Sequence, residues 1–264
     1  MRLIATDLDG TIVRPDGTVS DRTAEVLARA RATGVRLVLV TGRPSRWLEA
    51  LRVSLGGLGT AICSNGAVVV DDDAGVILEA TTLSVDEVLE ARARVLSVAP
   101  DAVFAAETVS GLHLEAGFAS SLAEREGLRA GPFDAAALAA EGVVKLLAKR
   151  PGADCASFER AAAPVLDGLV SLTHSAPRVA LIEMASPGVD KSVTLARHAA
   201  RLGIDAADVV AFGDMPNDIG MLTWAGTGFA VGSGQPRVMA AADRVIGTVE
   251  EDSVARALEE LLPA

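Results

Sequence analysis

The chain has 264 residues, a formal net charge of −11 and a pI near 4.8, and half of its residues are apolar. That length allows one large domain or two modest ones. The acidic charge argues against nucleic acid or an anionic membrane as a partner, no apolar run is long enough to span a bilayer, and nothing indicates a protein partner. Cys63 and Cys155 are isolated and lack metal-ligand spacing, which predicts reduced thiols in a cytoplasmic protein.

The first part of the chain alternates between strands and helices. Residues 3–5 form a continuous apolar run, which predicts a buried strand. Residues 12–19 contain Pro15 and Gly17 at turn positions, which predicts a β-hairpin. The other elements expected before residue 83 are helices over 21–32 and 45–55, and strands over 35–40, 60–63, 68–70 and 76–78.

The pattern changes between residues 83 and 184, where short strands and helices mix without regular alternation. Such a two-layer arrangement over about 100 residues predicts an inserted α+β domain. The expected helices cover 84–98, 119–126, 134–140 and 154–166, and the expected strands cover 103–106, 112–115, 143–148, 169–173 and 178–183.

Alternation resumes after residue 185. A parallel sheet interrupted by an insertion explains this order, so we expect a doubly wound, Rossmann-like α/β core over 1–82 and 185–264. The domain over 83–184 is expected to cover the carboxyl ends of the core strands. The last elements expected are helices over 190–202, 216–224, 235–241 and 251–262, and strands over 209–212, 228–231 and 244–246.

Two acidic residues follow the first strand within the sequence Asp7-Leu8-Asp9-Gly10-Thr11. Open α/β sheets bind their ligands at the carboxyl ends of the strands, which is where these residues are expected. Because the two carboxylates repel each other, the loop requires either a bound cation or a proton on one of them.

Two further segments favour anion binding. Thr41-Gly42 ends the strand over 35–40, and the glycine allows backbone N–H groups to approach an anion. Lys191 falls in the first turn of a helix, where a cation opposes the helix dipole unless an anion binds to both. The chain has only three lysines among its 24 lysine and arginine residues, so we expect Lys191 to have a role that arginine could not fill. The other two, Lys145 and Lys149, are expected to have no role in the site.

A third strand end carries Asp214 within the sequence Gly-Asp-Met-Pro-Asn-Asp, followed by Asn217 and Asp218 as a helix begins. Asp214 is expected to occupy a loop position that matches Asp7 on an adjacent strand. Their carboxylates, with a loop carbonyl and waters, suit octahedral Mg²⁺.

These four segments, in this order, resemble the motifs of the haloacid dehalogenase (HAD) superfamily. The large insertion resembles the α+β cap of the Cof-type branch, as do Ser64-Asn65-Gly66-Ala67 and the segment 225–226. The chain departs from that pattern at 231–234, where Val-Gly-Ser-Gly replaces the Met-Gly-Asn-Ala of many relatives. The role of this loop is left open.

The resemblance implies a Mg²⁺-dependent phosphatase that acts through an aspartyl-phosphate on a small phosphorylated metabolite, with sugar phosphates as the first candidates. Asp7 is implied as the nucleophile, which Mg²⁺ and Lys191 keep ionised. Asp9 is implied as the general acid and then the base, and nearby anions and partial burial are expected to keep a proton on it. The implied metal ligands are Asp7, Asp214 and the backbone carbonyl of Asp9.

The remaining residues are implied to bind substrate or to support that binding. Arg43 is expected to meet the substrate beyond its phosphate, and Asp218 to orient Lys191 or a metal-bound water. The residues expected to hold the phosphoryl group itself are Thr41, Gly42, Lys191 and Asn217.

Two alternatives remain open at this stage. A sugar phosphomutase would use the same aspartyl-phosphate, and a labelled sugar phosphate would distinguish it. A non-enzymatic phosphoacceptor resembling a receiver domain would release no phosphate from p-nitrophenyl phosphate. The natural substrate, the residues of the inserted domain that select it and the oligomeric state cannot be read from the sequence.

Overall fold

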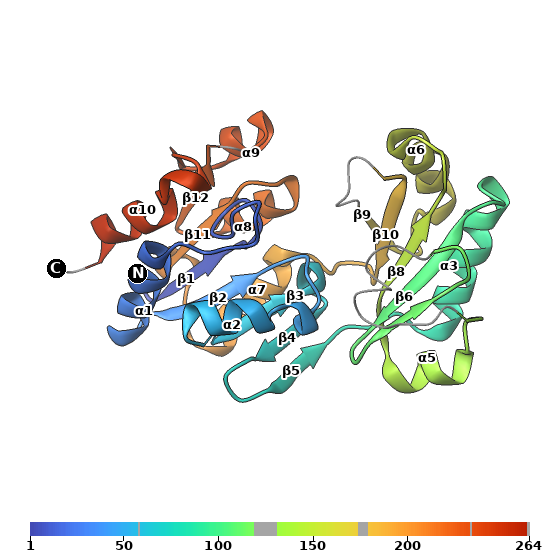
Figure 1. The fold of residues 1–264 in the computed structure, drawn as a ribbon, viewed down its shortest axis with the longest axis horizontal. Helices are drawn as coiled ribbons and strands as arrows, with labels where there is room; N and C mark the ends of the chain where they lie inside the picture. Colours follow the sequence, from blue (N-terminus) through green and yellow to red (C-terminus); the bar gives the residue numbers. More distant parts are fainter. Residues whose placement is uncertain (58, 119–130, 174–178, 233, 263–264) are drawn as a thin grey trace. The chain divides into compact units, whose positions relative to one another are not determined.

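The computed structural model describes residues 1–57, 59–118, 131–173, 179–232 and 234–262. The chain divides into two compact units (Figure 1). The core is Met1–Glu79 with Asp190–Ala264, and the inserted domain is Ala80–Val189. Residues 80–82 and 185–189 therefore group with the inserted domain, whereas the sequence-based ranges assign them to the core.

The core is built on an eight-stranded sheet in the order β13-β12-β11-β1-β2-β3-β4-β5. Neighbours from β13 to β3 pair in parallel, and β4 is antiparallel to β3. The direction of winding reverses at β1, so the crevice for a ligand lies at the carboxyl ends of β1 and its neighbours. The strands are β1 (Leu3–Thr6), β2 (Arg36–Val40), β3 (Thr60–Cys63), β4 (Val68–Asp71), β5 (Val76–Ala80), β11 (Val209–Gly213), β12 (Thr227–Val231) and β13 (Arg244–Ile246).

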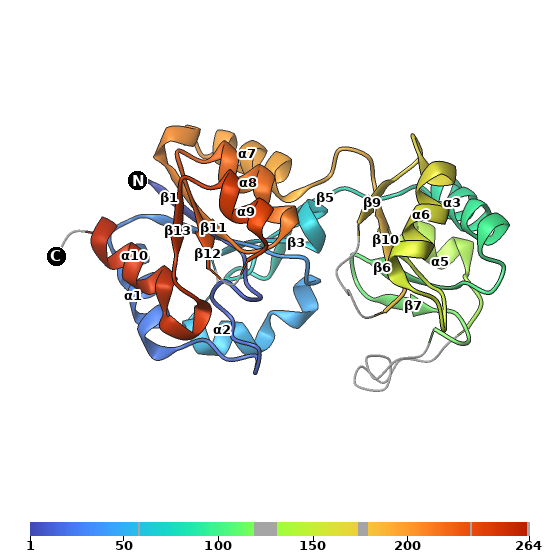
Figure 2. The ribbon, with the colours of Figure 1, turned by 90° about the horizontal axis from the view of Figure 1, so that it is seen from above.

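Helices cover both faces of this sheet (Figure 2). On one face, Leu195 of α7 and Met221 of α8 pack against Leu3 and Ala5 of β1. The confirmed fold class is thus a doubly wound α/β core. The helices are α1 (Asp21–Ala32), α2 (Glu49–Leu55), α7 (Lys191–Arg201), α8 (Ile219–Trp224), α9 (Pro236–Ala241) and α10 (Ser253–Leu261), with short 3-10 turns η1 (Ser45–Trp47), η2 (Ser64–Gly66), η3 (Ala206–Asp208), η4 (Pro216–Asp218) and η5 (Val249–Glu251).

The hairpin expected over residues 12–19 forms only at its turn, where the N–H of Arg14 donates to the carbonyl of Thr18 and the N–H of Gly17 donates to the carbonyl of Arg14, both at 2.9 Å. The flanking residues 12–13 and 18–19 belong to no strand. The carbonyl of Leu8 accepts the N–H groups of Ile12 and Val13, at 3.0 and 2.8 Å, so the segment curls back onto the loop after β1. The expected helix over 45–55 also differs, because it divides into η1 and α2.

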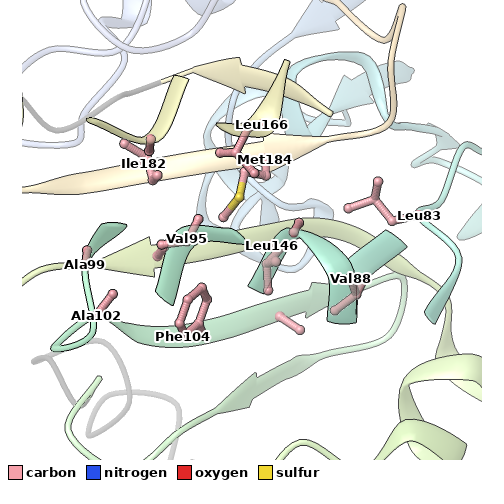
Figure 3. Close-up of a cluster of buried hydrophobic side chains, with 14 of the residues drawn as sticks. Leu83, Val88, Val95, Ala99, Ala102, Phe104, Leu146, Leu166, Ile182 and Met184 are labelled. Carbon is pink, nitrogen blue, oxygen red and sulfur yellow. The ribbon is translucent and has the colours of Figure 1, made fainter. Parts of the chain in front are cut away.

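The inserted domain has a five-stranded antiparallel sheet in the order β7-β6-β8-β10-β9. Val88 and Val95 of α3 pack with Phe104, Leu146 and Met184 of the sheet (Figure 3). The helix expected over 119–126 lies outside the described residues. Among the residues that the structure describes, no helix is long and apolar enough to cross a membrane. The elements are α3 (Val85–Val98), β6 (Val103–Thr108), β7 (Leu112–Leu114), α5 (Ala135–Glu141), β8 (Val143–Lys149), α6 (Cys155–Leu166), β9 (Ser171–Thr173) and β10 (Leu181–Ala185).

A buried ion pair lies on the sheet of the inserted domain. Lys145 Nζ is 2.9 Å from Glu183 Oε2, and the two side chains are 5% and 6% exposed. Glu107, also buried, is opposite Lys145 in the register of β6 and β8. Because strand residues alternate between faces, Lys145 shares a face with Leu147 and not with Leu146 of the helix-covered core. Lys145 is therefore buried on the face of this sheet opposite the helix-covered core.

Candidate active site

The loops after three neighbouring strands of the core bring the predicted site residues together. Asp7 follows β1, Thr41 follows β2 and Asp214 follows β11, and β1 pairs with both other strands. The backbone N–H of Asp7 donates to the carbonyl of Phe212 at 2.9 Å, which extends the pairing of β1 and β11 into the site. These residues all belong to the core unit.

Lys191 joins two of the acidic residues. It is the first residue of α7, whose N-cap, Asp190, accepts the N–H of Val193 at 2.8 Å. Its Nζ donates to Asp7 Oδ1 and to Asp218 Oδ1, both at 2.6 Å, and its side chain is 1% exposed. Although burial lowers it, the carboxylates of Asp218 and Asp7 together raise the pKa of Lys191, so the ammonium stays charged.

Asp218 is held through both of its carboxylate oxygens. While Oδ1 accepts from Lys191, Oδ2 accepts the backbone N–H groups of Asp214 at 3.1 Å and Met215 at 2.9 Å. Its side chain is 0% exposed. The geometry therefore makes Asp218 the support of both Lys191 and the loop that carries Asp214.

Asp214 is oriented by the loop after β1. Thr11 Oγ1 donates to Asp214 Oδ1 at 3.0 Å. Gly10 has a φ of 82°, and a Cβ there would lie 2.6 Å from Asp214 Oδ2, so only glycine fits. The site predicted from the sequence does not include Thr11, although the position of Thr11 at the end of the Asp-Leu-Asp-Gly-Thr motif could have identified it.

Asp9 lies in a different environment from the one expected. Its side chain is 59% exposed, so the expected partial burial is wrong. Arg43 Nε donates to Asp9 Oδ2 at 2.8 Å, and Arg43 Nη2 contacts Asp9 Oδ1. The backbone N–H of Arg43 also donates to Thr41 Oγ1 at 3.0 Å. Arg43 thus connects the loops after β1 and β2.

Asn217 contacts a residue that the sequence-based site does not contain. Its Nδ2 donates to Asn65 Oδ1 at 3.0 Å, which links η4 to the turn after β3. The loop over 231–234 also approaches the site, because a Cβ on Gly234 would lie 2.6 Å from the carbonyl oxygen of Asp214. Ser233 of that loop lies outside the described residues.

Three of the acidic residues offer carboxylate oxygens that suit a hard cation. One carboxylate oxygen from each of Asp7, Asp214 and Asp218 lies within 4.8 Å of the others. Burial, more than any neighbouring charge, raises the pKa of Asp7 to about 8 and that of Asp214 to about 6, and Asp218 adds to both shifts. Lys191 opposes the shifts without cancelling them. Because the cluster holds more negative charge than its one ammonium balances, its oxygen donors fit a divalent metal ion.

The fold and this cluster define an α/β enzyme with an acidic, lysine-containing site at the switch point of its sheet. A profile of the haloacid dehalogenase-like hydrolase family matches residues 4–258, and the chain belongs to that family. It is a phosphatase of this superfamily and has the inserted domain of the Cof-type branch. The non-enzymatic alternative is therefore wrong.

Relatives resemble the chain along nearly its whole length. Pyridoxal phosphate phosphatase YbhA of Escherichia coli is 30% identical, over 97% of this chain and 96% of its own. The 5-amino-6-(5-phospho-D-ribitylamino)uracil phosphatase YcsE of Bacillus subtilis is 29% identical, over 98% and 94%. HMP-PP phosphatase of Serratia proteamaculans is 28% identical, over 99% and 95%.

Solved structures agree with the fold. A haloacid dehalogenase-like hydrolase from Bacteroides thetaiotaomicron superposes with a TM-score of 0.82 at 25% identity, covering 99% of both chains. The HAD subclass IIB sugar phosphatase BT4131 gives a TM-score of 0.78 at 20% identity, also over 99% of both chains, and supports the fold alone.

Proposed function

We propose that this chain is a Mg²⁺-dependent phosphatase that hydrolyses small phosphomonoesters through an aspartyl-phosphate. The observation that carries the proposal is the buried ammonium of Lys191, held at 2.6 Å by both Asp7 and Asp218 where the strands end. A fixed charge in a water-poor site stabilises charge that develops on a phosphoryl group more strongly than a solvated one does.

In the first step, Asp7 is the nucleophile. Its Oδ1 accepts from Lys191, so Oδ2 is the oxygen available for attack on phosphorus. A bond forms between this oxygen and phosphorus, the ester P–O bond breaks, and the leaving oxygen takes a proton from Asp9. In the second step Asp9 removes a proton from water as that water attacks phosphorus, the bond to Asp7 breaks, and inorganic phosphate leaves.

The other residues bind the phosphoryl group or the metal. Mg²⁺, when bound, supplies positive charge that offsets the charge on the phosphoryl oxygens. Asp218 orients Lys191 in the proposed site. Thr41, Gly42, Lys191 and Asn217 hold the phosphoryl group, and Asp7, Asp214 and the carbonyl of Asp9 hold the metal.

Arg43 requires a change from its position in the structure. While Arg43 binds both oxygens of Asp9, that carboxylate is not free to exchange a proton with the substrate. A guanidinium also binds phosphate oxygens, so we propose, in place of the expected contact beyond the phosphate, that the substrate dianion competes for Arg43 and frees Asp9. Once Arg43 has moved, Asp9 takes a proton from the bulk water to which its side chain is exposed, and it can then donate that proton to the leaving oxygen.

The proposed substrates are small phosphorylated metabolites of the cytoplasm. To the sugar phosphates that the resemblance implies, the names of the relatives add pyridoxal phosphate, a phosphoribitylamino-uracil and HMP-PP as candidates. Cys63 and Cys155 are both free thiols, as suits a reducing compartment.

The test is release of inorganic phosphate from p-nitrophenyl phosphate and from a panel of phosphorylated vitamins, sugars and nucleotides. We expect turnover with Mg²⁺, its loss with EDTA and its return with added Mg²⁺. A protein saturated with Mg²⁺ that releases no phosphate from any ester contradicts the proposal. Isomerisation of a labelled sugar phosphate without phosphate release would instead favour the phosphomutase.

A further inference from the structure

The chain contains only two asparagines, and their side chains are joined by a hydrogen bond. Asn65 and Asn217 are 152 residues apart in sequence, and Asn217 Nδ2 donates to Asn65 Oδ1 at 3.0 Å. Asn217 is expected to bind the phosphoryl group, whereas Asn65 has no assigned role. Retention of asparagine at these two positions alone raises the question of what the pair does.

The backbone at Asn65 has an uncommon conformation. Ser64, Asn65 and Gly66 have φ values of 51°, 57° and 108°, so three consecutive residues are left-handed. A left-handed non-glycine residue costs about 1–2 kcal/mol, although asparagine tolerates it better than most. Glycine would relieve that cost at position 65, and a side chain retained there must therefore make a contact that matters.

Neighbouring groups hold this turn firmly in place. The N–H of Ser64 donates to the carbonyl of Arg43 at 2.9 Å, and the N–H of Asn65 donates to the carbonyl of Thr41 at 3.0 Å. On the other side, Thr194 of α7 donates its hydroxyl to the carbonyl of Gly66 at 2.9 Å. The turn therefore connects the loop after β2 with the helix that begins at Lys191.

The amide of Asn65 lies against the phosphate-binding loop. A Cβ at Gly42 would be 3.1 Å from Asn65 Oδ1, closer than most real contacts of that kind. Glycine at position 42 thus leaves room for the Asn65 amide. This is a second reason for glycine there, besides allowing backbone N–H groups to approach a phosphate. Asn65 is consequently placed between Gly42 and Asn217.

We propose that Asn65 is a positioning residue that fixes the orientation of the Asn217 amide. Its Oδ1 takes one hydrogen of Asn217 Nδ2, which leaves the second hydrogen to donate to a phosphoryl oxygen. Without this partner the amide can turn over and present its own oxygen to the dianion, which would repel it. The inference rests on the proposed function, because it concerns binding of the same phosphoryl group.

The test is a double-mutant cycle of Asn65→Gly and Asn217→Ala, with kcat/KM measured on p-nitrophenyl phosphate and on pyridoxal phosphate. We expect Asn65→Gly to lower kcat/KM about tenfold, and by the same factor for both esters, because they share only the phosphoryl group. In the Asn217→Ala background, Asn65→Gly should change kcat/KM by less than about twofold.

A matched variant separates the amide from the backbone. Asn65→Ala also lacks the amide but keeps the left-handed strain, so it should match Asn65→Gly in kcat/KM and melt at a lower temperature. Wild-type kcat/KM in Asn65→Gly, effects that multiply in the double variant, or a loss confined to one ester would each overturn the inference. A wild-type protein inactive on every ester would overturn the proposed function first, and the inference with it.

Discussion

Two lysines of this chain are buried and paired with carboxylates, but their surroundings differ. Lys191 lies at the N-terminus of α7 beside the ends of parallel strands, where three clustered carboxylates exceed its single charge. Lys145 lies within a strand of an antiparallel sheet, where it is buried and paired with Glu183. Burial and an ion pair alone therefore do not distinguish the two lysines. The excess of negative charge around Lys191, at the ends of parallel strands, does.

The largest expected effect is the loss of turnover when Asp7, which accepts a hydrogen bond from Lys191, is replaced. Asp7→Asn should lower kcat by about 10⁴-fold or more, because the amide keeps the shape and the contact with Lys191 but is not an anionic nucleophile. Phosphate release measures the loss, and circular dichroism with thermal melting shows whether the fold is kept. Substantial turnover in a folded Asp7→Asn protein would reject covalent catalysis by Asp7.

Lys191→Arg should lower kcat/KM by on the order of 10², or about 2.7 kcal/mol, although the charge is unchanged. Arginine is longer and planar, and the space between Asp7 and Asp218 is closed to solvent. Lys149→Arg, on β8, is the matched control and should be silent. If the Lys191→Arg protein kept the wild-type kcat/KM, a positive charge of either shape would suffice for activity at position 191. The different surroundings of Lys191 and Lys145 would then not reflect a need for lysine in the site.

Gly66→Ala should destabilise the core by about 2 kcal/mol or more and lower activity with it. A Cβ there would lie 2.3 Å from the carbonyl oxygen of Asp190, the N-cap that starts α7 at Lys191. Gly34→Ala is the control, since Gly34 also has a positive φ, 86°, but nothing lies within 4 Å of its Cβ position. Urea denaturation compares the two variants, and equal losses would mean that only backbone strain matters.

The smallest expected effect is at the other buried lysine. Lys145→Arg should cost about 1 kcal/mol of stability, because a larger group must fit a buried position, while kcat/KM of the folded protein stays unchanged. This replaces the sequence-based expectation that the exchange is silent. Denaturant unfolding measures the stability. A fall in kcat/KM without a loss of stability would show that Lys145 acts on the substrate and that the two lysines are alike.

The sequence predicted the order of the elements and the strand ends that carry Asp7, Thr41 and Asp214, because buried strands and turn residues are local patterns. The structure brings Lys191 to Asp7 and Asp218 as that order implies. The catalytic and binding roles of these residues remain predictions.

The remaining features depend on distant contacts that no local pattern contains. The pairing of Asn65 with Asn217 and of Arg43 with Asp9 follows from how the loops after different strands meet. The hairpin expected over residues 12–19 keeps its turn but lacks its strands, because the N–H groups of Ile12 and Val13 donate to the carbonyl of Leu8. In each case hydrogen bonding in three dimensions outweighs the preference of a short sequence.

The discontinuous core has a consequence for biosynthesis. Leu3 of β1 pairs with Val209 of β11, while the inserted domain lies between them as one continuous stretch, Ala80–Val189, with its own sheet. At a synthesis rate of about 5–20 residues per second, the ribosome takes on the order of 10 s after making β1 to reach β11, with which β1 pairs. The inserted domain emerges complete during that interval. The nascent chain therefore carries an open sheet edge at β1 until β11 arrives, and the site, which needs Lys191 and Asp214, assembles only after the inserted domain has been made.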